Sequence, residues 1–122
     1  MIRKALVADD SPMDREVVVE ALDCLAPDLQ VCTASDGSEA CDKAEGGEFD
    51  VVFTDLKMPG ADGLTVLEAA RKTCPDTEVV IITGHADVSS AVEAMKKGGF
   101  DYLTKPISVD EVAAVMAKLS RH

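Results

Sequence analysis

The sequence predicts an α/β protein with a flavodoxin-like, doubly wound (βα)5 fold, in which a five-stranded parallel sheet of order 2-1-3-4-5 has helices on both faces. Five short apolar segments alternate with five segments of helical pattern along the 122 residues. The segment EVVIIT at residues 78–83 is nearly all β-branched, which is typical of a strand buried on both faces. The connections are short, and the right-handed crossover rule leaves few topologies, of which we favour this one.

The first predicted helix has signals at both of its ends. Ser11 is the expected N-cap with Pro12 at the first helical position, and Pro27 ends the helix after about residue 25. A second helix at residues 38–45 ends at a pair of glycines. The strands around these two helices are KALVA at 4–8, QVCTA at 30–34 and DVVFT at 50–54.

The second half of the chain continues the alternation. A helix at residues 63–73 ends before Pro75, and Asp87 is the expected cap of a helix that ends at a second pair of glycines. The strands on either side of that helix are EVVIIT at 78–83 and DYLT at 101–104.

The last helix begins with a capping box, Ser108-Val-Asp-Glu111. One face of this helix is apolar and is expected to dock on the sheet. The residues that share the face at the helical period are Val109, Val112, Ala113, Met116 and Leu119.

The composition indicates one globular domain spanning residues 1–122. Apolar residues make up 47% of the chain and charged residues 29%, which argues against disorder. The net charge of −11 at pH 7 argues against direct nucleic-acid binding, because a phosphate backbone would be repelled. Cations and basic protein surfaces remain compatible partners.

Four cysteines and a short apolar start indicate where the chain resides. No cysteine belongs to a C-x-x-C pair, so we expect reduced, mostly buried thiols and a cytoplasmic location. The four-residue apolar run before Asp9 is too short for a signal peptide or a membrane span. We therefore expect no membrane association.

Polar side chains collect where the predicted strands end. Asp9 and Asp10 follow the first strand, Asp55 follows the third, Thr83 ends the fourth and Lys105 follows the fifth. Because ligands of open α/β sheets bind at the carboxyl ends of the strands, we expect these five side chains to converge.

Three converging carboxylates predict a cation site. Like charges raise one another's pKa unless a cation offsets them, and Mg²⁺ suits a site of few carboxylates and several waters, with Mn²⁺ as an alternative. A carboxylate such as Asp55 can act as a nucleophile in phosphoryl transfer. Lys105 would supply a point charge for phosphoryl oxygens, and Thr83 a hydroxyl donor.

Four motifs, each at a strand end, carry a family resemblance: LVADDS, FTDLKMPGADG, IITGHAD and FDYLTKP. In this order they resemble the receiver domain of two-component response regulators, with a chemotaxis-regulator-like fold, over essentially the whole chain. The stretch ITGHADVSSAVEAMKKGGFDYLTKP at residues 82–106 most resembles receivers of bacterial enhancer-binding transcription activators. The chain would then be either a single-domain regulator or a receiver from a longer protein.

The resemblance implies a phosphoacceptor site. Asp55 would accept a phosphoryl group from a phosphohistidine on a sensor histidine kinase or phosphotransfer protein. Asp10, Asp55 and the backbone carbonyl of Lys57 would contact Mg²⁺ directly, with Asp9 helping through water. The Lys105–Pro106 peptide bond is expected to be cis.

The resemblance also implies a switch. Thr83 would move toward the phosphoryl group and Tyr102 would turn inward, altering a surface made of the fourth helix, the fifth strand and the last helix. That surface would regulate transcription through an effector outside this chain. Lys57 and His85 would flank the water that hydrolyses the acyl phosphate. We expect no enzyme beyond this Mg-dependent self-phosphorylation, from phosphohistidine or small donors, and slow self-dephosphorylation.

Plainer readings of these residues, and rival functions, stay open at this point. Tyr102 is otherwise a core or edge aromatic, and His85 a surface loop residue.

A degenerate receiver acting as a scaffold would lack one of the five site residues, but all five are present. An aspartyl phosphatase would need a second carboxylate two residues after Asp55, where the chain has Lys57. A flavodoxin would need a hydroxyl-rich phosphate loop after the first strand, where this chain has Asp9 and Asp10. The sequence does not identify the kinase, the effector, the phosphoryl lifetime or the oligomeric state.

Overall fold

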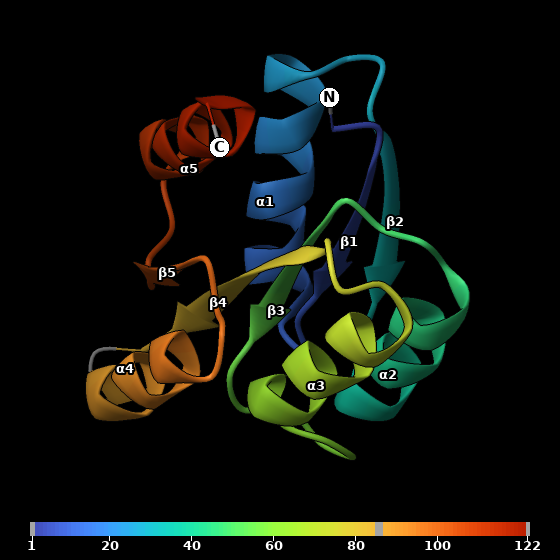
Figure 1. Ribbon diagram of the computed structural model, residues 1–122. Coiled ribbons are helices and arrows are strands. Elements are labelled where there is room, and N and C mark those ends of the chain that lie inside the picture. Colours follow the sequence, from blue (N-terminus) through green and yellow to red (C-terminus); the bar gives the residue numbers. More distant parts are fainter. Residues whose placement is uncertain (1, 85–86, 122) are drawn as a thin grey trace.

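A single parallel sheet forms the centre of the protein, as seen in the computed structural model, which describes residues 2–84 and 87–121. Its strand order is β2-β1-β3-β4-β5, so the predicted fold class and topology are confirmed (Figure 1). All four neighbouring pairs of strands are parallel. The elements are β1 Lys4–Ala8, α1 Pro12–Leu25, β2 Gln30–Ala34, α2 Gly37–Gly46, β3 Val51–Asp55, α3 Gly63–Thr73, β4 Glu78–Thr83, α4 Val88–Lys96, β5 Asp101–Thr104 and α5 Val109–Arg121.

The sheet divides the core into two layers because successive strand residues point to opposite faces. Val51 and Phe53 of β3 pack in a cluster with buried residues of α1 and α5. Val52, between them, packs in a second cluster with buried residues of α2, α3 and α4. All three side chains are fully buried, which explains why the strand sequences are almost continuously apolar.

Side-chain caps fix where the helices begin. The Ser11 hydroxyl accepts a hydrogen bond from the backbone N–H of Asp14 at 3.3 Å, and Pro12 occupies the first helical position of α1. The predicted capping box of α5 is present: Ser108 Oγ accepts from the Glu111 N–H at 3.2 Å, and Glu111 Oε1 accepts from the Ser108 N–H at 3.3 Å.

Several element boundaries and exposures differ from the prediction. β3 extends to Asp55, which is therefore the last strand residue, and α2 begins at Gly37 because the Asp36 carboxylate caps it. In α5, Val115 is buried and Val109 is half exposed. The buried positions of this helix are Val112, Val115 and Leu119, so the docking face lies slightly around the helix from the predicted one.

The cysteines are free, as predicted, but the expectation that most are buried is wrong. Cys24 is exposed, and Cys32, Cys41 and Cys74 are half-buried. Cys24 lies two residues beyond the buried Leu22, which places it about 200° around α1 from that side chain. Among the residues described, no helix is long and apolar enough to cross a membrane.

Thr77 lies just before β4 and bonds to Phe49, which lies shortly before β3, so this contact can be used to test what stabilises the fold. Its buried hydroxyl donates to the Phe49 carbonyl at 2.6 Å. Thr77→Val is expected to destabilise the protein by about 1–2 kcal/mol, because the carbonyl loses its buried donor. Urea unfolding followed by circular dichroism measures this. Thr33→Val, at an exposed position of β2, is the matched control and should change the free energy of unfolding by less than about 0.5 kcal/mol.

Candidate functional site

The acidic residues of the site come from two adjacent strands. β1 ends at Ala8, immediately before Asp9 and Asp10, while β3 ends at Asp55 itself. Ala8 is paired with Thr54 in the sheet, so Asp9 and Asp55, which follow them, are also neighbours. Ligand oxygens of Asp9, Asp10 and Asp55 all lie within 4.8 Å of one another. The structure thus brings together the three carboxylates that the sequence singled out.

Two of these three carboxylates are buried. Asp9 has no exposed surface and Asp55 is 6% exposed, whereas Asp10 is exposed. Asp9 Oδ1 accepts a hydrogen bond from the Ser11 N–H at 2.9 Å. Asp9 Oδ2 is buried and has no hydrogen-bond partner among the described residues, although Lys105 Nζ lies 3.3 Å away in an ion pair. A buried carboxylate oxygen without a donor is the chemistry that a bound cation would satisfy.

The pKa of Asp9 reflects its burial and its incomplete hydrogen bonding. Burial, together with the nearby charge of Asp55, raises the pKa of Asp9 from 3.8 to about 6. The Ser11 N–H and the Lys105 ammonium group act in the opposite direction without offsetting the burial. A divalent cation would favour the ionised form of this carboxyl group.

Lys105 places a positive charge among the carboxylates of the site. Its Nζ lies 3.1 Å from Asp55 Oδ2 and 3.0 Å from Asp14 Oδ2. Burial acts to lower the pKa of Lys105, but the hydrogen bonds to Asp14 and Asp55 outweigh it and raise the pKa above its ordinary value. The backbone N–H of Lys105 donates to the Thr83 carbonyl at 2.8 Å, and the Lys105–Pro106 bond is cis.

The predicted switch residues lie on β4 and β5. Thr83, the last residue of β4, is almost fully buried, and its hydroxyl donates to the Gly84 carbonyl at 3.2 Å. Tyr102, on β5, is partly buried and packs against the core cluster of α2, α3 and α4. β5 pairs with β4 and forms one edge of the sheet. Tyr102 is therefore an edge aromatic in this state.

The residues predicted to tune hydrolysis are only partly described. The Lys57 side chain is mostly exposed, and its Nζ pairs with Asp87 Oδ1 at 2.7 Å. The Lys57 N–H donates to Asp55 Oδ1 at 3.4 Å. His85 lies outside the described residues, and the metal-ligand role of the Lys57 carbonyl stays a prediction.

Three charged residues, namely Asp14, Arg15 and Asp87, were not assigned to the site from the sequence. Asp87 does occupy the N-cap of α4, but its carboxylate pairs with Lys57 and makes no capping hydrogen bond. The Arg15 guanidinium donates to the Asp9 carbonyl at 2.8 Å. Asp14 pairs with Lys105. The spacing Ser11-x-x-Asp14 was a usable signal for Asp14, because it places an acid in the first turn of a helix that begins at the site.

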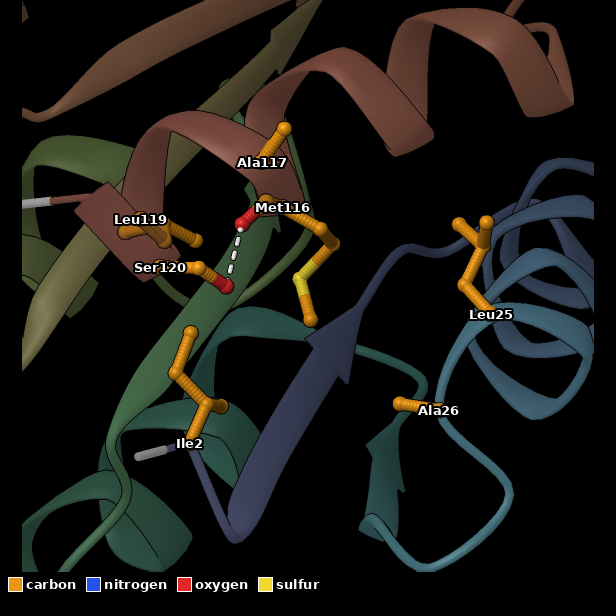
Figure 2. A pocket seen from close by; sticks show the side chains of 7 residues that line it. All are labelled: Ile2, Leu25, Ala26, Met116, Ala117, Leu119 and Ser120. Atoms are coloured by element: carbon orange, nitrogen blue, oxygen red, sulfur yellow. Dashed lines mark hydrogen bonds between the residues drawn. The ribbon is translucent and has the colours of Figure 1, made fainter.

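A pocket elsewhere in the molecule is not part of this site. A largely apolar pocket of about 490 Å³ is lined by Ile2, by Leu25 and Ala26 at the end of α1, and by residues of α5 such as Met116. Figure 2 shows these side chains. Ile2 precedes β1, whereas Asp9 follows it, so the pocket lies at the opposite end of the sheet.

Several curated proteins that are similar to the chain are named as transcription regulators. It is 36% identical over 118 residues to the DNA-binding transcriptional regulator NtrC of Klebsiella pneumoniae, a match that covers 97% of this chain and 25% of that protein. It is 37% identical over 108 residues to the C4-dicarboxylate transport transcriptional regulatory protein DctD of Pseudomonas aeruginosa, covering 88% and 23%. The chain thus spans about a quarter of the length of these relatives. The predicted closeness to receivers of enhancer-binding activators is confirmed.

Solved structures agree with the sequence relatives. The REC domain of AraT, a response regulator from Geobacillus stearothermophilus, matches with a TM-score of 0.90 and 38% identity over 99% of this chain and 95% of that one. The receiver domain of NtrX from Brucella abortus matches with a TM-score of 0.86 and 29% identity, covering 96% and 98%. A family model described as the response regulator receiver domain matches residues 5–117. The chain therefore belongs to the response regulator receiver domain family.

Proposed function

We propose that this receiver domain accepts a phosphoryl group on Asp55 from a phosphohistidine of a sensor histidine kinase or phosphotransfer protein. One observation carries the proposal: the Asp55 carboxylate lies in a group with Asp9 and Asp10 and also has Lys105 Nζ at 3.1 Å. A carboxylate at a rigid strand end, beside both a cation site and a fixed ammonium group, is arranged for nucleophilic attack on phosphorus.

The transfer step exchanges one bond to phosphorus for another. An Asp55 carboxylate oxygen forms the new O–P bond as the P–N bond of the phosphohistidine breaks, and the electron pair leaves with the imidazole nitrogen. With acetyl phosphate as donor, a P–O bond breaks and acetate leaves. Lys105 neutralises charge on the phosphoryl oxygens, and the Thr83 hydroxyl becomes a donor to them.

The acidic residues fit a divalent cation, which we take to be Mg²⁺, with Mn²⁺ as an alternative. Asp9, Asp10 and Asp55 would hold it, together with the Lys57 carbonyl. Bound there, the cation supplies positive charge that offsets both the carboxylates and the incoming phosphoryl group. The orphaned Asp9 Oδ2 supports this assignment.

The output would be a change of surface, without turnover of an external substrate. Thr83 would leave the Gly84 carbonyl for the phosphoryl group, and Tyr102 would repack on the surface of α4, β5 and α5. This surface would act on an effector that regulates transcription, in the cytoplasm. Lys57, with His85, would set the lifetime of the acyl phosphate, which the domain itself hydrolyses slowly.

The test is the intact mass of the protein after incubation with acetyl phosphate. One added phosphoryl group is expected with Mg²⁺, none with EDTA, and none in Asp55→Asn with Mg²⁺. An adduct that persists in Asp55→Asn would place the acceptor elsewhere. If no adduct forms under any condition and Mg²⁺ binding is also absent, the domain is an interaction scaffold and the proposal is wrong.

A further inference from the structure

Lys105 has one partner that stands outside the cation site. Its Nζ lies 3.0 Å from Asp14 Oδ2, 3.1 Å from Asp55 Oδ2 and 3.3 Å from Asp9 Oδ2. Three carboxylates therefore face one ammonium group, which donates hydrogen bonds to Asp9 Oδ1 at 3.4 Å and Asp55 Oδ2 at 3.1 Å and forms an ion pair with Asp14. Asp9 and Asp55 belong to the group that can hold a cation, and Asp14 does not. When a cation takes up the charge of the first two, Asp14 still faces the lysine.

The fold brings Asp14 and Lys105 together from two elements. Asp14 lies in the first turn of α1, where its N–H is bound to the Ser11 hydroxyl. Lys105 follows β5, and its N–H is bound to the Thr83 carbonyl. Both backbones are therefore fixed by other bonds, and the two side chains are only 32% and 24% exposed. The dipole of α1 favours an acid at this position in any case, but it does not require the acid to face Lys105.

We propose that Asp14 is a positioning residue that holds Lys105 toward α1 and so slows the capture of a phosphodonor at Asp55. This inference rests on the proposed phosphoacceptor function. Two effects act in the same direction. The Asp14 carboxylate competes with phosphoryl oxygens for the ammonium group, and its negative charge repels an incoming dianionic donor. Asp14 would thus set how readily the domain is phosphorylated without touching the phosphoryl group.

The first test is the rate of adduct formation at saturating Mg²⁺ as a function of acetyl phosphate concentration, followed by intact mass. Asp14→Asn keeps the shape and removes the charge. It should lower the apparent KM for acetyl phosphate about three- to fivefold and leave the maximal rate within about twofold of wild type. Asp14→Glu keeps the charge and should restore the wild-type KM. The matched control is Asp110→Asn, which removes an exposed acid from the first turn of α5 and should change neither value.

A merely structural role for Asp14 would not give this split between KM and maximal rate, nor would the glutamate variant reverse it. An unchanged KM in Asp14→Asn, or a glutamate variant that behaves like the asparagine variant, would overturn the proposal.

The second test needs no phosphoryl transfer. The unfolding equilibrium constant is measured in EDTA for wild type, Asp14→Asn, Lys105→Met and the double variant. If Asp14 holds Lys105, the effect of Asp14→Asn should differ at least about twofold between the two backgrounds. Equal effects would refute the link between the two residues. If the coupling is observed but no adduct forms, both the proposed phosphoacceptor function and the kinetic role of Asp14 are wrong. If the adduct forms but no coupling is observed, only the Asp14 proposal is wrong.

Discussion

Lys105→Met is expected to slow the phosphorylation of Asp55 by acetyl phosphate by about 10²- to 10³-fold, the usual effect of removing a charge-stabilising donor from a transferring group. The reason is geometric: Lys105 Nζ is already 3.1 Å from Asp55 Oδ2, where phosphoryl oxygens would arrive. The variant keeps most of the side-chain volume, so the fold should persist. The time course of intact mass measures the rate, and it suits a chain without tryptophan.

The same variant should bind Mg²⁺ at least as tightly as wild type, because an ammonium group that competes with the cation for Asp9 and Asp55 is gone. A loss of rate without a loss of metal affinity would separate the two roles of the site. Lys72→Met, at an exposed position of α3, is the control and should leave the rate unchanged. A Lys105→Met rate within about threefold of wild type would contradict the role of Lys105 in the transfer.

Asp9→Asn is expected to stabilise the metal-free protein by about 1–3 kcal/mol at about pH 7.5. The folded-state pKa of Asp9 is about 6, above the ordinary value of 3.8. A carboxyl group with a raised pKa contributes full stability below pH 3.8, and that contribution is lost as the pH rises through about 6. The benefit of the substitution should therefore be absent near pH 4 and complete above pH 6 to 7.

Urea unfolding in EDTA at several pH values measures this gain, with Asp28→Asn in an exposed turn as the control. Saturating Mg²⁺ should stabilise wild type more than Asp9→Asn, and so reduce or reverse the difference. If Asp9→Asn is less stable than wild type in EDTA at neutral pH, the buried carboxylate does not destabilise the metal-free protein and the prediction is wrong.

The fold followed closely from the sequence because its signals are local and agree with one another. Ser11, Pro12 and the capping box at Ser108 mark helix starts, and each is present where expected. Because right-handed crossovers restrict the topology, the convergence of Asp9, Asp10 and Asp55 at one edge also followed.

What the sequence did not predict depends on side-chain direction. The position of Asp14 in the first turn of α1 is evident from its spacing to Ser11, but its approach to Lys105 needs the relative placement of α1 and β5. The pairing of Asp87 with Lys57, in place of a helix cap, likewise depends on two loops that are distant in sequence. Val109 is exposed because the rotation of α5 about its own axis depends on all of its contacts with the sheet and α1. A periodic sequence pattern predicts that rotation only to within about one residue.

Tyr102 gives the domain a built-in optical probe. The chain has one tyrosine and no tryptophan, so nearly all of its intrinsic fluorescence arises from this single ring on β5. The ring is partly buried at the edge of the sheet, beside the surface proposed to change on phosphorylation. A change in tyrosine emission when phosphodonor is added would therefore report on this one location, without any label or introduced fluorophore.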